Sequence, residues 1–155
     1  MTGTWPEPAT SASRAGIDAE GAPRPVGHYP HARRVGNLLF LSGIGPRDPQ
    51  TNAIPGNELY ADGRVRRYDI VAQAHAVFAN VRSVLEASGA RMEHLVDVTV
   101  YLTDMLRDFR LYNQVWAEYF PDPATAPCRT TVGITALPTP IAIELKCTAV
   151  LPEGR

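Results

Sequence analysis

The chain has 155 residues, of which 45% are hydrophobic and 20% are charged, and this is the composition of one ordinary soluble domain. Fifteen basic and sixteen acidic residues leave a formal net charge of −1, which gives no strong field for binding nucleic acid or anionic lipid. No apolar run reaches the roughly 18 to 20 residues of a membrane-spanning helix, and the start of the chain lacks the apolar segment of a signal peptide. We therefore expect a cytoplasmic protein.

The cysteine and lysine content limits the kinds of catalytic site that the chain can form. Cys128 and Cys147 form no C-x-x-C pair, and no H-x-E motif accompanies them. This argues against a structural zinc site and against the zinc-dependent nucleoside deaminases, which need three protein ligands and a glutamate. Because Lys146 is the single lysine, Schiff-base chemistry would have to use this residue or the N-terminal amine.

The first part of the chain divides into an arm and the start of a domain. Residues 1–26 are rich in proline and small residues, which predicts a flexible arm before a single domain of residues 27–155. Residues 34–42 are largely apolar and are interrupted by Gly36 and Asn37, which predicts a pair of strands joined by a tight turn.

The middle of the chain alternates between helical and strand periodicity. Residues 46–68 are polar, contain several prolines and glycines, and predict a long loop. A helix is predicted to begin after Asp69 and to end near Gly89, because apolar residues recur between them at steps of three and four. Strict alternation predicts a strand over 95–102, and a second apolar stripe predicts a helix that Pro121 ends.

Two further strands are expected over 128–135 and 141–150. If their apolar faces enter one core and a short connection joins them, they pair as neighbouring antiparallel strands. That register places four side chains in one polar patch on the sheet face away from the helices, namely Arg129, Thr131, Glu144 and Lys146.

The element order predicts an α+β fold with helices on one face of a sheet, and we expect the other face to pack against a second subunit. Within the patch, Arg129 has the geometry to grip a substrate carboxylate, and Glu144 can orient or deprotonate a water. From spacing alone, an ion pair at an interface is the more common arrangement for such residues. The four histidines show no metal-ligand spacing, and Ser42-Gly43 lacks the G-x-S-x-G pattern of a nucleophile elbow.

Several spaced motifs extend from Gly27 over most of the chain. They are Gly27-His28-Tyr29, Phe40-Leu41-Ser42-Gly43, the run from Val98 to Asp104, Tyr112-Asn113, Tyr119-Phe120, the run from Pro127 to Val132, Ala136-Leu137-Pro138 and Ile143-Glu144. Together they resemble the Rid superfamily, also called the YjgF family, of small imine and enamine deaminases.

The resemblance implies a chorismate-mutase-like fold, with a mixed β-sheet and two helices on one face, in a homotrimer whose active sites lie between subunits. It implies neither a metal nor an organic cofactor. Arg129 matches the arginine that binds the substrate carboxylate, and Glu144 matches the acid that positions or activates water. The other matched positions are the pocket residues Tyr29, Ser42 and Asn113, and Thr131, whose backbone contacts the substrate.

Two departures from the general pattern indicate a branch of the superfamily. The loop over 46–68 is long, and Tyr29 is followed by Pro30-His31-Ala32-Arg33-Arg34. Both features are similar to the 2-aminomuconate deaminases, which act in the degradation of aromatic compounds. Their substrate is a dicarboxylate, and a second carboxylate needs a second cation, for which the candidates are Arg33, Arg34 and Arg47.

The leading hypothesis is hydrolytic deamination of 2-aminomuconate to 2-oxo-3-hexenedioate (4-oxalocrotonate) and ammonia, through the imine tautomer. A general deaminase of 2-iminoacids, of the 2-iminobutanoate and 2-iminopropanoate type, would use the same site residues. The chain is also compatible with an enzyme that forms a covalent imine on Lys146 and with a non-catalytic trimeric ligand-binding module.

Overall fold

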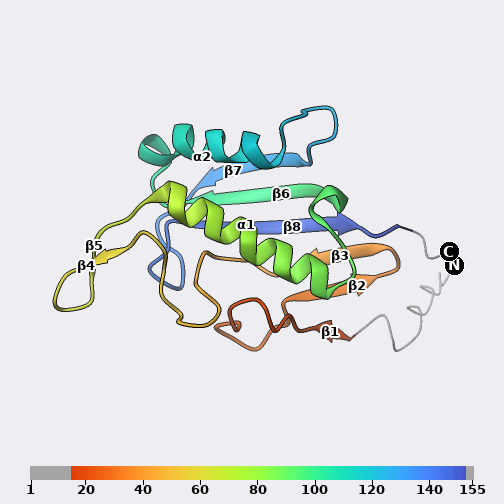
Figure 1. Cartoon of the computed structure of the whole chain (residues 1–155), viewed down its shortest axis with the longest axis horizontal. Helices are drawn as coiled ribbons and strands as arrows, with labels where there is room; N and C mark the ends of the chain where they lie inside the picture. The colour runs from red at the N-terminus through yellow and green to blue at the C-terminus, as the bar shows by residue number, and fades with distance from the viewer. Residues whose placement is uncertain (1–14, 153–155) are drawn as a thin grey trace, which may run out of the picture.

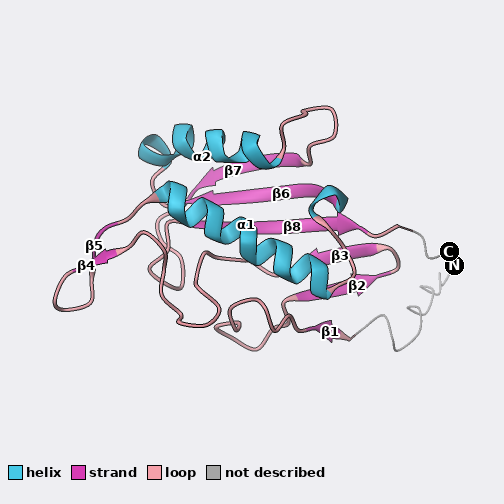
Figure 2. Ribbon diagram, in the orientation of Figure 1, coloured by secondary structure: helices cyan, strands magenta, loops and turns pink. Residues whose placement is uncertain are grey.

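The computed structural model describes residues 15–152 as a mixed six-stranded sheet with both α-helices on one face (Figures 1 and 2). The strand order in this sheet is β1-β2-β3-β8-β6-β7. The elements are β1 (Gly16–Ile17), β2 (Ala32–Val35), β3 (Leu38–Leu41), β4 (Glu58–Leu59), β5 (Val65–Arg67), α1 (Ile70–Ala87), η2 (Met92–His94), β6 (Leu95–Leu102), α2 (Met105–Tyr119), β7 (Cys128–Gly133) and β8 (Ile143–Val150). The predicted α+β architecture is confirmed.

The long helix α1 begins and ends where its capping residues predict. The side chain of Asp69 accepts hydrogen bonds from the first backbone N–H groups of the helix, including that of Val71 at 2.9 Å. Past the last turn, Gly89 has a φ of 76°, a conformation that glycine adopts without strain. One side of the helix is fully buried against the sheet through Ala74, Val77, Phe78, Val81, Val84 and Leu85. Within residues 15–152, no helix has the length and apolarity needed to cross a bilayer.

The strands β2 and β3 form the predicted hairpin. Gly36, at the turn, has a φ of 59°. Residues with a side chain rarely adopt this conformation, whereas glycine adopts it without strain. Leu39 and Leu41 are fully buried under the helices, whereas Leu38 and Phe40 point to the other face of the sheet. This alternation fixes which face of each neighbouring strand enters the core.

The end of the chain is arranged differently from the sequence prediction. β7 pairs with β6 in parallel, and α2 forms the crossover connection between them. β8 lies between β3 and β6 and is antiparallel to both. The predicted antiparallel pairing of the strands over 128–135 and 141–150 is therefore wrong. Parallel strands need a long connection, and the order strand, helix, strand from β6 to β7 supplies one.

The prediction of a flexible arm over 1–26 is wrong for the part that the structure describes. β1 pairs with β2, and the small side chains of Ala19 and Ala22 are buried. The buried ring of His31 holds this segment: Nδ1 accepts the N–H of Ala19 at 3.1 Å, and Nε2 donates to the carbonyl of Pro23 at 2.9 Å. Residues 1–14 lie outside the described part of the chain.

The predicted loop over 46–68 contains a short hairpin formed by β4 and β5. Side chains of both helices form hydrogen bonds with this loop. The amide of Gln73 on α1 donates to the side chain of Asn57 at 2.8 Å, and the Tyr68 hydroxyl donates to the buried carboxylate of Asp108 on α2 at 2.6 Å. Burial raises the pKa of Asp108 and raises the pKa of Tyr68 to about 12.

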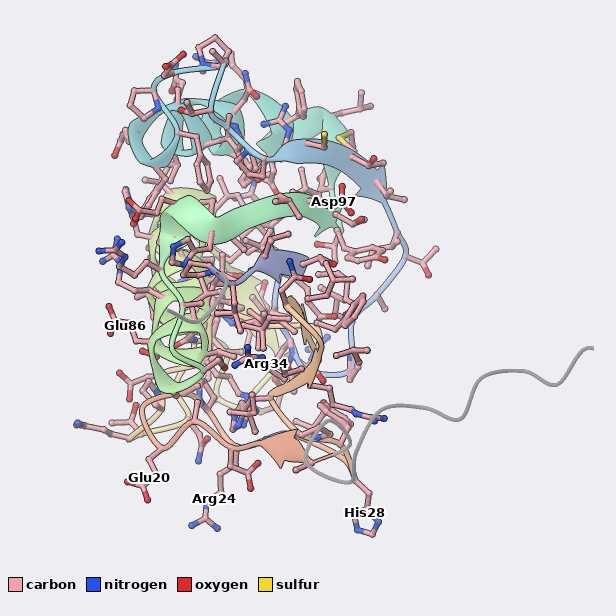
Figure 3. The ribbon with its side chains drawn as sticks, turned by 90° about the vertical axis from the view of Figure 1, so that its right-hand side faces the viewer. Glu20, Arg24, His28, Arg34, Glu86 and Asp97 are labelled. Atoms are coloured by element: carbon pink, nitrogen blue, oxygen red, sulfur yellow. The ribbon has the colours of Figure 1, made fainter. Side chains whose placement is uncertain are left out.

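The sheet face away from the helices is partly apolar and uncovered by the described residues. In the turned view of Figure 3, Asp97 on β6 points to the side opposite α1. On the same face, Val35 is 50% exposed and Phe40 is 40% exposed. Exposed apolar side chains that cluster on one face are typical of an interaction surface.

Candidate functional site

A cavity of about 400 Å³ opens where the end of β3 approaches the start of β8. Three of the predicted site residues line it: Tyr29, Ser42 and Glu144. The other lining residues are Pro23, Arg24, Pro25, Val26, His31, Gly43, Ile44, Gly45, Arg47, Pro138, Thr139, Ile141 and Lys146. The cavity therefore combines apolar walls with one carboxylate and several cations, a composition that suits a small organic anion.

Glu144 contributes the single carboxylate of this cavity. It alternates on β8 with the buried Ile143 and Leu145, so its side chain points to the face away from the helices. Desolvation raises the pKa of the half-buried carboxyl, and no cation or hydrogen-bond donor in the described chain offsets the effect. A carboxyl whose pKa is raised by burial and that lies in a cavity is suited to proton transfer.

Gly43 provides the space that the Glu144 side chain occupies. A Cβ built on Gly43 would overlap the carboxylate oxygen Oε1 of Glu144. The requirement for glycine is therefore one of close approach, because the φ of Gly43 does not lie in the positive range. In the sequence, Gly43 follows the predicted strand over 34–42 and belongs to a family motif, but neither feature reveals this function of the glycine.

Two hydrogen bonds of Ser42 hold the Pro30–His31 segment at the cavity wall. Its hydroxyl donates to the carbonyl of Pro30 at 2.6 Å, and its backbone N–H donates to the carbonyl of His31 at 2.9 Å. These bonds hold the segment that carries Tyr29 against the end of β3. Tyr29 lines the cavity and is 43% exposed.

Arg129 does not line this cavity. It lies on the helix-covered side of the edge strand β7. It is opposite Val98 in the parallel β6–β7 ladder, and Val98 is fully buried in the core. The Arg129 guanidinium lies 4.9 Å from the ring centroid of Trp116 and 5.8 Å from that of Tyr112, both on α2. Its Nη1 atom is buried without a hydrogen-bond partner among residues 15–152. An unpaired guanidinium N–H group of this kind can bind an anion at this edge of the sheet.

Asn113 and Thr131 belong to the same side of the molecule as Arg129. Thr131 lies opposite the buried Val100, so its side chain shares the helix-covered face of β7. Because β7 is an edge strand, one side of its backbone has no strand partner within the described chain. Asn113 on α2 is four residues after Phe109, whose ring centroid is 5.9 Å from the Arg129 guanidinium.

The predicted site residues thus form two separate groups in one chain. Tyr29, Ser42 and Glu144 line the cavity, whereas Asn113, Arg129 and Thr131 lie on and under α2 at the β7 edge. The predicted patch that joined Arg129 and Thr131 to Glu144 and Lys146 is wrong. β6 lies between β7 and β8, and its register places the two pairs of side chains on opposite faces.

The sequence prediction also missed a wall of the cavity. Four residues that were assigned to the arm, Pro23 to Val26, line it, and the hydrogen bonds of His31 hold them in place. The segment before them packs through the small buried side chains of Ala19 and Ala22, and it lacks the large apolar residues that indicate a core segment in a sequence. Of the three arginines suggested for a second carboxylate, Arg47 lines the cavity, and Arg33 and Arg34 on β2 do not.

Among residues 15–152, no three histidine, cysteine, aspartate or glutamate side chains lie together in a way that would hold a metal ion. The two cysteines are free, with Cys128 exposed and Cys147 buried. Burial raises the pKa of the Cys147 thiol to about 12, so this thiol stays protonated and unreactive.

Known proteins are similar to this chain in sequence and in structure. A RutC family protein of Pyrococcus horikoshii is 38% identical over 133 residues, which are 86% of this chain and 94% of the relative. A protein of Arabidopsis thaliana named Reactive Intermediate Deaminase A, chloroplastic, is 34% identical over 92% of this chain and 69% of its own length. The crystal structure of E. coli TdcF with bound serine superimposes with a TM-score of 0.76 at 29% identity, covering 90% of this chain and all of the other.

The family match covers most of the sequence. Residues 19–151 match the family described as Endoribonuclease L-PSP, and this range includes the cavity, the β7 edge and both helices. The crystal structure of the E. coli YjgF gene product, with 31% identity and a TM-score of 0.74, has the same fold. The chain therefore belongs to the Endoribonuclease L-PSP family, which is the Rid or YjgF superfamily that the sequence motifs predicted.

Proposed function

We propose that this protein catalyses the hydrolytic deamination of 2-aminomuconate to 2-oxo-3-hexenedioate (4-oxalocrotonate) and ammonia, without metal or organic cofactor. The observation that carries the proposal is the desolvated carboxyl of Glu144, which shares a cation-lined cavity with Tyr29 and Ser42. The name of the Arabidopsis relative, Reactive Intermediate Deaminase A, supports the reaction class.

The complete site requires two protomers in this proposal. Arg129 and Glu144 lie on opposite faces of the sheet in one chain, so one small molecule cannot contact both of them there. In a cyclic homotrimer each protomer presents two different surfaces, and the β7 edge of one can meet the cavity of the next. The exposed apolar side chains of Val35 and Phe40 supply contact area for such an assembly.

The proposed chemistry needs one anion-binding group and one proton relay. The enamine first moves a proton from nitrogen to the terminal carbon of the diene, which gives the electrophilic imine. Arg129 of one protomer holds the carboxylate beside the imine carbon, and Glu144 of its neighbour takes a proton from the attacking water. Glu144 returns that proton to the nitrogen, which gives a neutral carbinolamine. It then carries the hydroxyl proton of the carbinolamine to the same nitrogen, so that the C–N bond breaks and ammonia leaves as the carbonyl forms. Because imines already hydrolyse in water, positioning and one proton relay are sufficient.

A general 2-iminoacid deaminase is the second candidate. It shares every site residue and differs only in the substrate. The bound serine in the TdcF structure favours it, because serine is a small amino acid with one carboxylate.

The test compares ammonia release from 2-aminomuconate and from 2-iminobutanoate, each generated in situ, with the purified full chain. We expect a higher kcat/KM for 2-aminomuconate and loss of both activities in Glu144→Gln. A preference for 2-iminobutanoate would replace the first candidate with the second. Binding of carboxylates without any ammonia release would overturn both and would favour a non-catalytic ligand-binding module.

A further inference from the structure

The cavity holds more positive charge than one substrate carboxylate requires. Arg24, Arg47 and Lys146 line it together with the single acid Glu144. Arg129 is not among them, although it is the arginine proposed above to bind the carboxylate beside the imine. A cation that remains free inside this cavity is therefore available for a second anionic group of the substrate.

Arg47 is the cation that the chain holds most firmly. Its Nη1 donates to the side-chain oxygen of Asn52 at 3.1 Å, and its Nη2 donates to the backbone carbonyl of Arg24 at 2.5 Å. Both acceptors are neutral, and Arg47 forms no ion pair within residues 15–152. The guanidinium is thus oriented by hydrogen bonds while its charge stays uncompensated, which suits it for binding a carboxylate.

The backbone of Arg47 is also fixed from the core. The buried side chain of Asn80 on α1 donates to the carbonyl of Arg47 and to the carbonyl of Gly45, each at 2.8 Å. Hydrogen bonds from α1 therefore fix the loop after β3 at the position where Arg47 lines the cavity. A cation held in this way loses little conformational freedom when an anion binds.

The remaining cations are less suited to this role. The Arg24 side chain extends away from the body of the molecule in Figure 3, and its carbonyl already holds Arg47. The Lys146 ammonium donates to the carbonyl of Leu41. Arg34 on β2 donates to the carbonyl of Gly36 at 2.8 Å and does not line the cavity.

We propose that Arg47 binds the second carboxylate of a dicarboxylic substrate and so determines the specificity of the site. This inference rests on the proposed deaminase function and adds the residue that selects a dicarboxylate over a monocarboxylate. The hydrocarbon between the two carboxylates lies against the apolar wall formed by Pro25, Ile44 and Ile141.

The test measures binding, so it does not depend on turnover. trans,trans-Muconate and sorbate share the same six-carbon diene and differ in that sorbate has one carboxylate. Calorimetric titration of the full chain with each acid gives a ratio of dissociation constants. We expect muconate to bind the wild type about ten- to a hundredfold more tightly than sorbate, as a charge-assisted bidentate contact implies.

Three variants locate the source of that preference. Arg47→Gln should bring the ratio close to one and leave sorbate affinity unchanged, whereas the control Arg66→Gln, on the exposed strand β5, should keep the wild-type ratio. Arg47→Lys, which keeps the charge but loses the planar fork, should give an intermediate ratio and serves if the glutamine variant does not fold.

Equal affinity of the wild type for the two acids, or a wild-type ratio in the Arg47 variants, would overturn the role of Arg47. Neither result affects the measurement of ammonia release from an imine, which tests the deaminase function separately. Conversely, a full Arg47-dependent preference in a chain that releases no ammonia would support the dicarboxylate site and reject the deaminase.

Discussion

Arg129 and Glu144 point to opposite faces of one β-sheet. Arg129 lies beside the buried Val98 of β6, whereas Glu144 lies beside Tyr101, whose side chain alternates with the core residues of the same strand. An intervening strand and a change of face therefore separate the two groups. If both act on one substrate, they must come from different protomers.

The pH dependence of kcat/KM should reflect the raised pKa of the half-buried Glu144 carboxyl. Desolvation raises the pKa of this carboxyl from its ordinary value of 4.5. Since the ionised form accepts the proton of water, kcat/KM should fall as the pH decreases through the raised pKa, at a pH above 4.5. Glu144→Gln should lower kcat/KM by about 10²- to 10⁴-fold and remove this acidic limb.

The control for that profile is the uncatalysed hydrolysis of the same substrate, which reveals the titration of the imine itself. An acidic limb at or below the ordinary carboxyl pKa, or an unchanged profile in Glu144→Gln, would contradict the proposed role of the glutamate.

Gly43→Ala should reduce activity by displacing Glu144. The new Cβ would overlap the carboxylate, so the side chain would have to move out of its position in the cavity. We expect kcat/KM to fall by at least about tenfold while the thermal unfolding midpoint changes little. The matched control is Gly21→Ala, whose Cβ would meet Ser83 at an ordinary 3.6 Å. Normal kinetics in Gly43→Ala would show that the close approach has no functional importance.

His31→Ala should loosen the N-terminal wall of the cavity. The substitution removes the acceptor for the Ala19 N–H and the donor to the Pro23 carbonyl, and it leaves a hole where a buried ring was. We expect a loss of about 2 kcal/mol in the free energy of unfolding and faster hydrogen exchange at the Ala19 amide. His28→Ala, at an exposed position labelled in Figure 3, should change neither quantity. Unaltered exchange in His31→Ala would mean that different contacts hold this segment.

Lys146 should not form a covalent imine with the substrate. Its side chain is used in a hydrogen bond to the Leu41 carbonyl, and a Schiff base would remove the donors of the ammonium. Borohydride added during turnover should leave the mass of the chain unchanged, and Lys146→Met should retain most of the wild-type kcat. A mass increase that appears in the wild type and is absent in Lys146→Met would establish the covalent route.

Local patterns in the sequence predicted the local structure well. The cap at Asp69, the stop at Gly89 and the turn at Gly36 are each determined by one residue and its neighbours, and the structure has all three. The strand over 95–102 was also predicted, although a bulge near its start buries Leu95 and exposes Val96. A bulge shifts the alternation by one residue, and the bare alternation of the sequence does not reveal it.

The candidate site was harder to predict because it depends on strand order. The side-chain pattern of β8 correctly placed Glu144 on the open face, but the partner strand was wrong. A short connection from β7 to β8 favoured a hairpin, whereas the crossover through α2 had already paired β7 with β6. The rule that strand, helix, strand units are parallel predicts β6 as the partner of β7, and the register of that pair places Arg129 on the helix side.

Complementation between protomers tests the shared site most directly. Chains of 16.9 kDa carrying either Arg129→Gln or Glu144→Gln are purified, confirmed as trimers by sedimentation, and assayed separately and after refolding together as an equimolar mixture. Each variant alone should be inactive. In the mixture, random assortment should restore about a quarter of the sites, since an intact site then receives Glu144 from one type of chain and Arg129 from the other. A mixture as inactive as its parents would contradict a site formed between protomers.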